Sequence, residues 1–431
     1  MAMSRIPGPI EADVLKTMDA IVKAPAVAKA LELAQAGAEA AMALQVHLCE
    51  IPAPTFEEQV RAEEMVRLMK ANGLKDVTID GIGNVVGRRP GKNPEGPLLV
   101  IGAHMDTVFP AGTEIKVRRE GNVYYGPGIG DNCSGLRWLF ETVRSMNEAG
   151  VETEGDIWFC GTVGEEGLGD IRGSKYLFRE SNTVNRIDGF LAIDNTDLGR
   201  ILCSAIGSHR WRFTVEGPGG HSYSGFGTTP SAIHAVCLAG AKVAHLKVPA
   251  DPKTTFTIGT IKGGTTVNSI AASCSVDIDI RSLDDGELKK AEDFIFKAFE
   301  DAVAEENAIW GVTDPKKQVH LKTESIGNRP GGTRPDECPV LQASRAAQAV
   351  LGIELTSYTD SSTDANMPVS LGIPATCLSA GGRQVRTHTI DEYYECFDIE
   401  KGPQLAMLAA VALVGLAGEH GTAPLLKKIG V

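Results

Sequence analysis

Three apolar runs in this chain each end in side chains that can bind metal or carry protons. They are PLLVIGAHMDT (97–107), DIWFCGTVGEEG (156–167) and IDGFLAIDNTD (187–197). A short run that is apolar on both faces is typical of a parallel strand buried between helices. Ligands of such sheets gather where the strands end. With helices alternating along the chain, the pattern predicts an α/β fold: a mostly parallel sheet with helices on both faces and a site at its carboxyl edge.

The pattern changes near Gly207. From there HRWRFTVEGPGGHS alternates like a strand, and a helix is predicted at about 230–246. Two further strands, a helix at about 285–307 and a last strand, KQVHLKTES, follow. This order predicts a small antiparallel α+β domain inserted into the first. The expected division is 1–206 and 327–431 for the two parts of a catalytic domain, with 207–326 inserted between them.

Composition narrows the class of protein. The 431 residues suffice for two cores, and a net charge of −13 argues against nucleic acid as a partner. Nine cysteines, an odd number without a CxxC pair, favour free thiols in a reducing compartment. The first residues do not resemble a signal peptide, and the longest apolar stretch, Leu405 to Leu416, is too short to span a bilayer. We therefore expect a cytoplasmic protein without a membrane partner.

The first two motifs carry candidate metal ligands. In AHMDTV, His104 can bind a divalent metal, and Asp106, two residues on, lies on the same face of the strand and can orient the ring. In YGPGIGDNCSG, Asp131 follows a glycine-rich turn at a helix start, where it could bridge two metals. Taken alone, each motif also fits a simple capping role.

The remaining motifs complete the set. Glu165 and Glu166 in GEEG point in different directions, so one can bind metal while the other acts as general base. The alternative is a solvated acidic loop. Asp194 in LAIDNTD and His388 in RTHTIDEYY add two further ligands. The motifs together supply two His, two Asp and one Glu plus a spare Glu, enough for two divalent ions of zinc, manganese or cobalt.

These motifs, together with GPGGHS, GGTTVNSI followed by DIDIR, STDAN and GGR…HTIDEYY, resemble one metallo-hydrolase family. It is the family of peptidase T, glutamate carboxypeptidase, acetylornithine deacetylase and succinyl-diaminopimelate desuccinylase, and the resemblance runs from about residue 40 to the C-terminus. The resemblance implies that His104 and Asp194 bind the first metal, that His388 and Glu166 bind the second, and that Asp131 bridges them.

The same resemblance implies roles beyond the ligands. Glu165 would be the general acid and base, and Asp106 would hold His104. His221, in GPGGHS, would donate to the developing oxyanion. In the family the equivalent histidine reaches the active site of the partner subunit, which implies a homodimer through the inserted domain acting as a lid and dimerisation domain. The sequence leaves open whether His221 acts in cis or in trans.

The sequence also offers candidates for substrate binding. The resemblance implies Asn268 and Arg281, and Arg329 is a further candidate, because an arginine can hold a carboxylate through two hydrogen bonds. An ordinary ion pair on a strand explains Arg281 equally well. The chain departs from the family at Asn132–Cys133 and in the arginine-rich stretch GGRQVRTH, both close to the expected substrate.

The leading hypothesis is a hydrolase that cleaves an amide-type C–N bond of a small acyl-amino acid or short peptide. A metal-activated water would attack, with Glu165 as general base. An aminohydrolase acting on a small, non-peptide, possibly aromatic compound uses the same chemistry, and the sequence does not separate the two. A catalytically inactive binding protein and a metal-free structural protein are further alternatives, disfavoured by the intact ligand set.

Overall fold

The chain folds into two compact units. The computed structural model describes residues 5–181 and 186–429. Unit 1 comprises Met1–Ala205 and Thr333–Val431, and unit 2 is the inserted segment Ile206–Gly332. The sequence placed the inserted segment at 207–326. The chain leaves unit 2 later than that because its last strand, β14 (His320–Arg329), continues beyond the KQVHLKTES pattern.

The main sheet of unit 1 has six strands in the order β1-β2-β6-β3-β7-β17. Its four strands β6, β3, β7 and β17 are parallel neighbours, whereas β1 and β2 pair antiparallel at one edge. The edge is antiparallel because a tight turn, in which Asp80 accepts the backbone N–H of Gly83 and Asn84, joins β1 to β2. The sheet is therefore mixed. Its strands are β1 (Lys75–Ile79), β2 (Val85–Arg89), β3 (Leu98–His104), β6 (Asp156–Thr162), β7 (Gly189–Ile193) and β17 (Ala375–Leu378).

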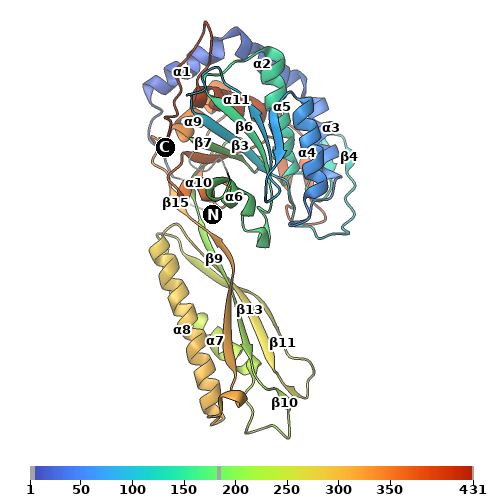
Figure 1. The fold of residues 1–431 in the computed structure, drawn as a ribbon, viewed down its shortest axis with the longest axis vertical. Helices are drawn as coiled ribbons and strands as arrows, with labels where there is room; N and C mark the ends of the chain where they lie inside the picture. The colour runs from blue at the N-terminus through green and yellow to red at the C-terminus, as the bar shows by residue number, and fades with distance from the viewer. Residues whose placement is uncertain (1–4, 182–185, 430–431) are drawn as a thin grey trace. The chain divides into compact units, whose positions relative to one another are not determined.

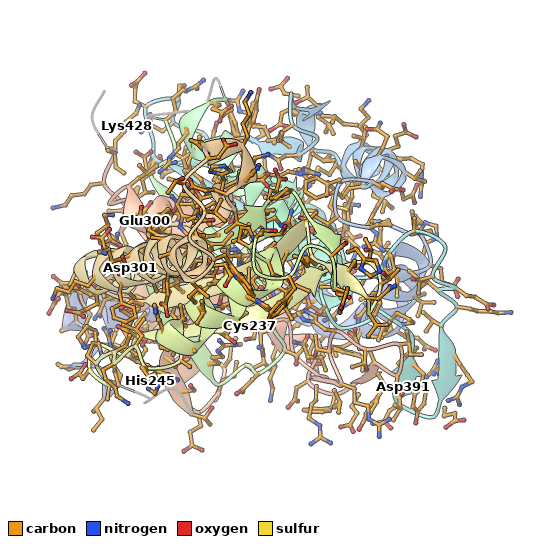
Figure 2. The ribbon with its side chains drawn as sticks, turned by 90° about the horizontal axis from the view of Figure 1, so that it is seen from below. Cys237, His245, Glu300, Asp301, Asp391 and Lys428 are labelled. Atoms are coloured by element: carbon orange, nitrogen blue, oxygen red, sulfur yellow. The ribbon has the colours of Figure 1, made fainter. Side chains whose placement is uncertain are left out.

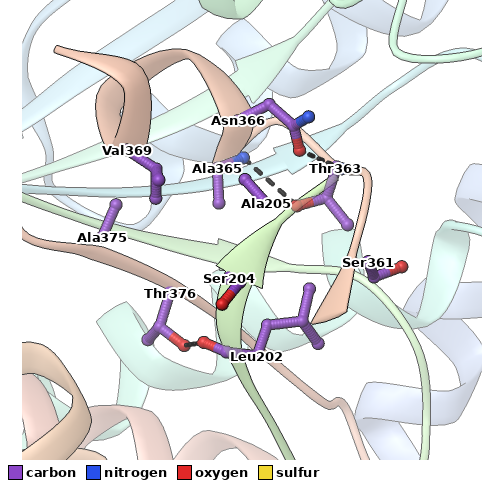
Figure 3. Close-up of a pocket in the computed structure, with 10 residues that line it drawn as sticks. All are labelled: Leu202, Ser204, Ala205, Ser361, Thr363, Ala365, Asn366, Val369, Ala375 and Thr376. Carbon is purple, nitrogen blue, oxygen red and sulfur yellow. Dashed lines mark hydrogen bonds between the residues drawn. The ribbon is translucent and has the colours of Figure 1, made fainter. Parts of the chain in front are cut away.

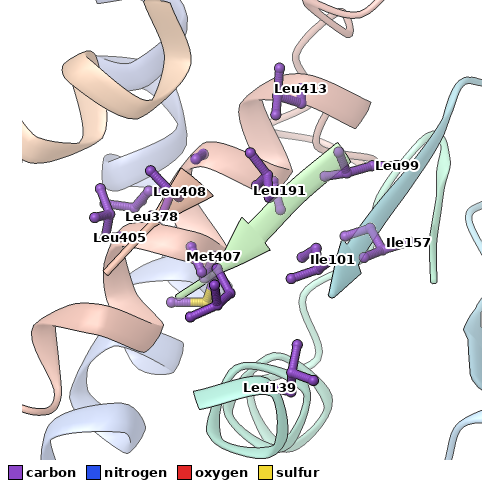
Figure 4. Close-up of a cluster of buried hydrophobic side chains, with 14 of the residues drawn as sticks. Leu99, Ile101, Leu139, Ile157, Leu191, Leu378, Leu405, Met407, Leu408 and Leu413 are labelled. Carbon is purple, nitrogen blue, oxygen red and sulfur yellow. The ribbon is translucent and has the colours of Figure 1, made fainter. Parts of the chain in front are cut away.

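Helices cover both faces of this sheet (Figure 1). Alternate residues of β3 divide between two cores, as the period of a strand requires. Leu99 and Ile101 pack with α5 and α11 (Figure 4), whereas Leu98 and Val100 pack with α6 and α10. The helices of unit 1 are α1 (Ala12–Lys23), α2 (Pro25–Ala36), α3 (Ala38–Cys49), α4 (Gln59–Ala71), α5 (Cys133–Ala149), α6 (Arg172–Arg179), α9 (Pro339–Val350), α10 (Asn366–Ser370) and α11 (Lys401–Val414).

A second, four-stranded sheet of unit 1 brings two distant loops together. In the order β18-β19-β5-β4, strand β19 pairs antiparallel with β5. The loop that follows β5 carries Asp131, and the loop between β18 and β19 carries His388. The strands are β4 (Arg118–Glu120), β5 (Val123–Tyr125), β18 (Arg383–Val385) and β19 (Tyr393–Glu395). Elsewhere in the unit β8 (Arg200–Ala205) pairs with β16 (Ser357–Ser361). The short strand β15 (Gly332–Thr333) lies where the chain passes from unit 2 back into unit 1.

Unit 2 is an antiparallel sheet in the order β11-β13-β9-β14, packed against two helices (Figure 1). Strand β13 alternates strictly: Val276, Ile278 and Ile280 are buried beneath the helices, and the residues between them are charged. The elements follow the strand–helix–strand–strand–helix–strand order that the sequence predicted. They are β9 (Gly207–Glu216), α7 (Ala232–Val243), β11 (Thr255–Gly263), β13 (Ser273–Ser282), α8 (Asp285–Ile309) and β14, with a short pair β10 (Gly220–His221) and β12 (Ser269–Ile270).

All nine cysteines are free thiols, and seven of them are buried. Cys237 on α7 is exposed (Figure 2). Among the described residues, no helix combines the length and hydropathy needed to cross a bilayer.

Candidate metal centre

The carboxyl edge of the main sheet carries four of the candidate site residues. His104 is the last residue of β3, Glu165 and Glu166 follow β6, and Asp194 follows β7 directly. Because these strands are parallel neighbours, their ends meet at one edge. Among the described residues, ligand atoms fall into three groups, each within 4.8 Å: His104 with Asp131 and Asp194, His104 with Glu165 and Glu166, and Asp131 with Glu166 and His388.

Asp131 lies between the two histidines. Its Oδ1 is 3.1 Å from Nε2 of His104, and its Oδ2 is 3.1 Å from Nε2 of His388. A carboxylate with one oxygen toward each histidine has the arrangement expected of a ligand that bridges two metals. Its neighbour Asn132 accepts a hydrogen bond from the backbone of Gly135 at the start of α5 and donates to the carbonyl of Ile193 at the end of β7. Asn132, a departure from the family pattern, thus fixes the loop to the sheet.

His388 reaches the cluster from a strained loop. Its Nε2 lies 3.0 Å from Oε1 of Glu166. Its backbone has φ of 66°, a left-handed conformation that few non-glycine residues adopt. Such conformations persist where the surrounding structure fixes them, and they are concentrated at functional sites.

Asp106 contacts His104 through both its main chain and its side chain. The ring Nδ1 of His104 lies 3.0 Å from the backbone carbonyl of Asp106 and 3.5 Å from its carboxylate. The fully buried carboxylate also accepts the backbone N–H groups of Glu165 at 2.9 Å and Glu166 at 3.0 Å, together with the hydroxyl of Thr55 at 2.9 Å. Asp106 therefore contacts the ring and fixes the acidic loop at the same time.

Glu392 is a further site residue, which sequence reasoning missed. Its side chain is 1% exposed and accepts three backbone N–H groups from the loop that bears the bridging carboxylate. The donors are Gly128 at 2.9 Å, Gly130 at 2.8 Å and Asp131 at 3.1 Å. Glu392 lies four residues after His388, so one carboxylate ties the two ligand-bearing loops together. Its only sequence signal was an acidic residue inside HTIDEYY.

The cluster holds protons that a metal would have to displace. Hydrogen bonds from the His388 ring to the carboxylates of Asp131 and Glu166 raise the pKa of His388 to about 10. Burial opposes a charge on His104, but Asp106 and Asp131 raise its pKa well above the ordinary value. Burial, reinforced by the charge of Asp131, raises the pKa of Asp194 to about 7. Burial likewise raises the pKa of Glu392 to about 7, against the three N–H groups that lower it.

The donor set fits two divalent metal ions. His104 Nε2 and Asp131 Oδ1 are buried and close together, yet their geometry is not that of a hydrogen bond. A cation bound by both atoms would satisfy both. Imidazole nitrogens and carboxylate oxygens without cysteine suit zinc, manganese or cobalt.

Metal binding is expected to release protons. At pH 7 the metal-free His388 carries a proton, because its pKa is about 10, and a ligating imidazole must lose it. His104 has a raised pKa as well, and Asp194, with a pKa of about 7, is about half protonated, so loading both sites should release about two to three protons at pH 7. Affinity should therefore fall as the pH falls. Calorimetric titration of the apoprotein in buffers of different ionisation enthalpy measures the released protons. Heats that are independent of the buffer would contradict this charge state.

Four predicted residues belong to unit 2. His221 on β10 and Asn268 beside β12 are neighbours, because the backbone N–H of Ser222 donates to the carbonyl of Asn268. Arg281 on β13 donates to Asp279 at 2.6 Å, the strand ion pair that was the alternative reading. Arg329 is buried at the end of β14. Roles in substrate binding stay predictions for all four.

Three residues of the STDAN motif, Thr363, Ala365 and Asn366, line a small cavity (Figure 3). Within it the backbone of Thr363 donates to Asn366, and Ala365 donates to the hydroxyl of Thr363. The cavity lies between β8, β16 and α10 and has a volume of about 10 Å³. That is room for roughly one water molecule.

Known proteins share sequence and fold with this chain. The model of peptidase family M20/M25/M40 matches residues 100–412. The protein YqjE of Bacillus subtilis (strain 168) is 26% identical over 329 residues, covering 74% of this chain and 82% of the relative.

Two solved structures share the fold. A tripeptidase of Staphylococcus aureus has a TM-score of 0.69 and 24% identity, over 86% of this chain and 98% of its own. The YXEP protein of Bacillus subtilis, described as a dinuclear metal-binding peptidase, has a TM-score of 0.62 and 16% identity, over 88% and 99%. This chain therefore belongs to peptidase family M20/M25/M40 and is a metallo-hydrolase.

Proposed function

We propose that this enzyme cleaves the amide-type C–N bond of a small acyl-amino acid or short peptide with two divalent metal ions. The observation that carries the proposal is the position of Asp131 between His104 and His388, with Glu165 in an overlapping group of ligand atoms. The names of the relatives, a tripeptidase and a dinuclear metal-binding peptidase, support a peptide-like substrate.

Residues of unit 1 would hold the metals. His104 and Asp194 would bind the first, His388 and Glu166 the second, and Asp131 both. When bound, two such ions supply Lewis acidity and make water a stronger acid near neutral pH.

Glu165 is proposed as the proton carrier. Its side chain is 5% exposed, and its backbone N–H is fixed by Asp106. Its neighbour Glu166 lies 3.0 Å from Nε2 of His388, and the carboxylate of Glu165 belongs to the group of ligand atoms formed with His104 and Glu166. We propose that it accepts a proton from the attacking water and delivers that proton to the leaving nitrogen.

His221 is proposed as the donor to the oxyanion. The backbone N–H of Tyr223 donates to Nδ1 of His221 at 3.2 Å. With Nδ1 accepting, the neutral ring carries its hydrogen on Nε2. That nitrogen would donate to a substrate oxygen as negative charge develops there. Homodimerisation through unit 2, and donation of His221 in trans, stay predictions.

Turnover by metal-loaded protein tests the proposal. We expect hydrolysis within a panel of dipeptides, tripeptides and N-acyl amino acids, with release of an amino acid and loss of activity in a chelated control. Amino-aromatic compounds belong in the same panel, because ammonia release from one of them would favour an aminohydrolase instead. Metal-loaded protein that hydrolyses none of the amides would contradict the proposed function.

A further inference from the structure

Phe56 combines an exposed aromatic ring with an unfavourable backbone. The residue follows α3 in the segment before α4 and is 60% exposed. Its φ is 79°, in the left-handed region that favours glycine. For a bulky residue this is a genuine outlier. Burial does not explain why a phenylalanine occupies position 56, because most of the ring faces solvent. A glycine would adopt the same backbone conformation without strain.

Residues on either side of Phe56, Thr55 before it and Glu58 two positions after it, are tied to the loops of the metal centre. The hydroxyl of Thr55 donates to the Asp106 carboxylate that also holds Glu165 and Glu166. Glu58, which is buried, accepts the backbone N–H of Gly164 at 3.0 Å, just before the acidic pair. The strained residue therefore lies between two anchors of the acidic loop.

The ring is held in place from one side. The guanidinium of Arg172 lies 5.1 Å from the ring centroid and is itself fixed by Glu58. A cation over one face of an aromatic ring is an attractive contact. It leaves the rest of the ring available to solvent or to a ligand.

Two further exposed apolar side chains lie on segments that contact Thr55. Val108 follows Thr107, whose carbonyl accepts the backbone N–H of Thr55. Leu168 precedes Gly169, where a Cβ would meet the Thr55 methyl at 2.6 Å. Val108 is 37% exposed and Leu168 59%. Three segments that meet beside Asp106 and Glu166 thus each present an apolar side chain to the outside.

We infer that Phe56, with Val108 and Leu168, forms an apolar subsite that selects substrates with an aromatic or branched aliphatic group next to the scissile amide. This inference rests on the proposed function and deepens it. The strain at Phe56 is then retained because it presents the ring at the metal centre. The subsite would determine which substrates bind. None of the three side chains takes part in proton transfer or metal binding.

Two variants separate the ring from the strain. Phe56→Gly removes both, and Phe56→Ala removes the ring while keeping a Cβ at positive φ. Val350→Ala is the control, because Val350 is similarly exposed at 41% but lies at the end of α9. Each protein is assayed with paired dipeptides or N-acyl amino acids that differ only in an apolar against a small or acidic group. Unfolding temperature and metal content are measured in parallel.

We expect the wild type to prefer the apolar partner of each pair. Both Phe56 variants should lower kcat/KM for it by about tenfold, mainly through KM, and leave the small partner little changed. Phe56→Gly should keep its metals and unfold at a temperature no lower than Phe56→Ala, since glycine relieves the strain. The control should keep the wild-type preference.

Several results would overturn the inference. A wild type that hydrolyses amides without an apolar preference, or a Phe56→Gly variant that retains the preference, would refute the subsite and leave the proposed function standing. A metal-loaded wild type that hydrolyses no member of the panel would refute the proposed function, and the subsite with it.

Discussion

Replacing Glu165 by Gln is expected to lower kcat by about 10²–10⁴-fold, the range typical of a lost general acid–base group. The amide has nearly the shape of the carboxylate but cannot accept a proton from water at neutral pH. The Asp106 carboxylate binds the backbone N–H of residue 165, so the loop should keep its conformation. Because the proposed ligands are untouched, metal content should stay at two ions per chain. Steady-state kinetics and metal analysis of the same preparation measure both.

The control for this substitution is Glu419→Gln, at an exposed position outside the site. It should match the wild type in rate and in metal content. A Glu165→Gln variant with undiminished turnover would refute the proposed proton carrier. Loss of one metal in that variant would show that Glu165 is a metal ligand. This is the alternative to the role of proton carrier, because an oxygen of Glu165 lies in one group with ligand atoms of His104 and Glu166.

The periodicity of the sequence was sufficient to predict the strands that position the site. Continuous apolar runs marked β3, β6 and β7, and the polar residues at their ends became neighbours because parallel strands finish at the same edge. The alternating pattern after Gly207 likewise marked unit 2. Antiparallel pairing of β1 and β2 at the edge escaped prediction, since it depends on the turn at Asp80 and not on burial.

Contacts between side chains and the backbone were harder to predict from sequence. The spacing of His104 and Asp106 suggested a carboxylate–imidazole pair, and the two groups lie 3.5 Å apart, but the spacing gave no sign of the closer contact of the ring with the main-chain carbonyl at 3.0 Å. Alternation along a strand says which face a side chain takes, and it does not say which backbone groups that side chain finds. Glu392 was missed for the same reason: its partners lie more than 260 residues earlier in the chain, at Gly128, Gly130 and Asp131.

Substitution of Glu392 is expected to weaken metal binding without removing any proposed ligand. In Glu392→Ala the N–H groups of Gly128, Gly130 and Asp131 all lose their acceptor, in a buried site where each unsatisfied group costs about 1–3 kcal/mol. The loop should shift to regain partners, and Asp131 shifts with it. Metal affinity should fall by about 10–100-fold, as for other residues that orient ligands.

A graded series of variants tests whether the loss of metal affinity comes from the acceptor oxygens of Glu392. Oε1 of Glu392 accepts two of the three N–H groups and Oε2 accepts the third, from Gly128. Glu392→Gln can keep the first two while its NH₂ group faces the third, so it should lose less affinity than Glu392→Ala. Glu395→Ala breaks a surface ion pair between Glu395 on β19 and Arg383 on β18; it is the matched control and should bind metal like the wild type. Isothermal titration of each apoprotein with zinc or manganese gives the order. Equal losses of metal affinity in all three variants would mean that the effect comes from general destabilisation of this segment. A graded loss confined to the two Glu392 variants would identify Glu392 as the residue that positions the bridging carboxylate.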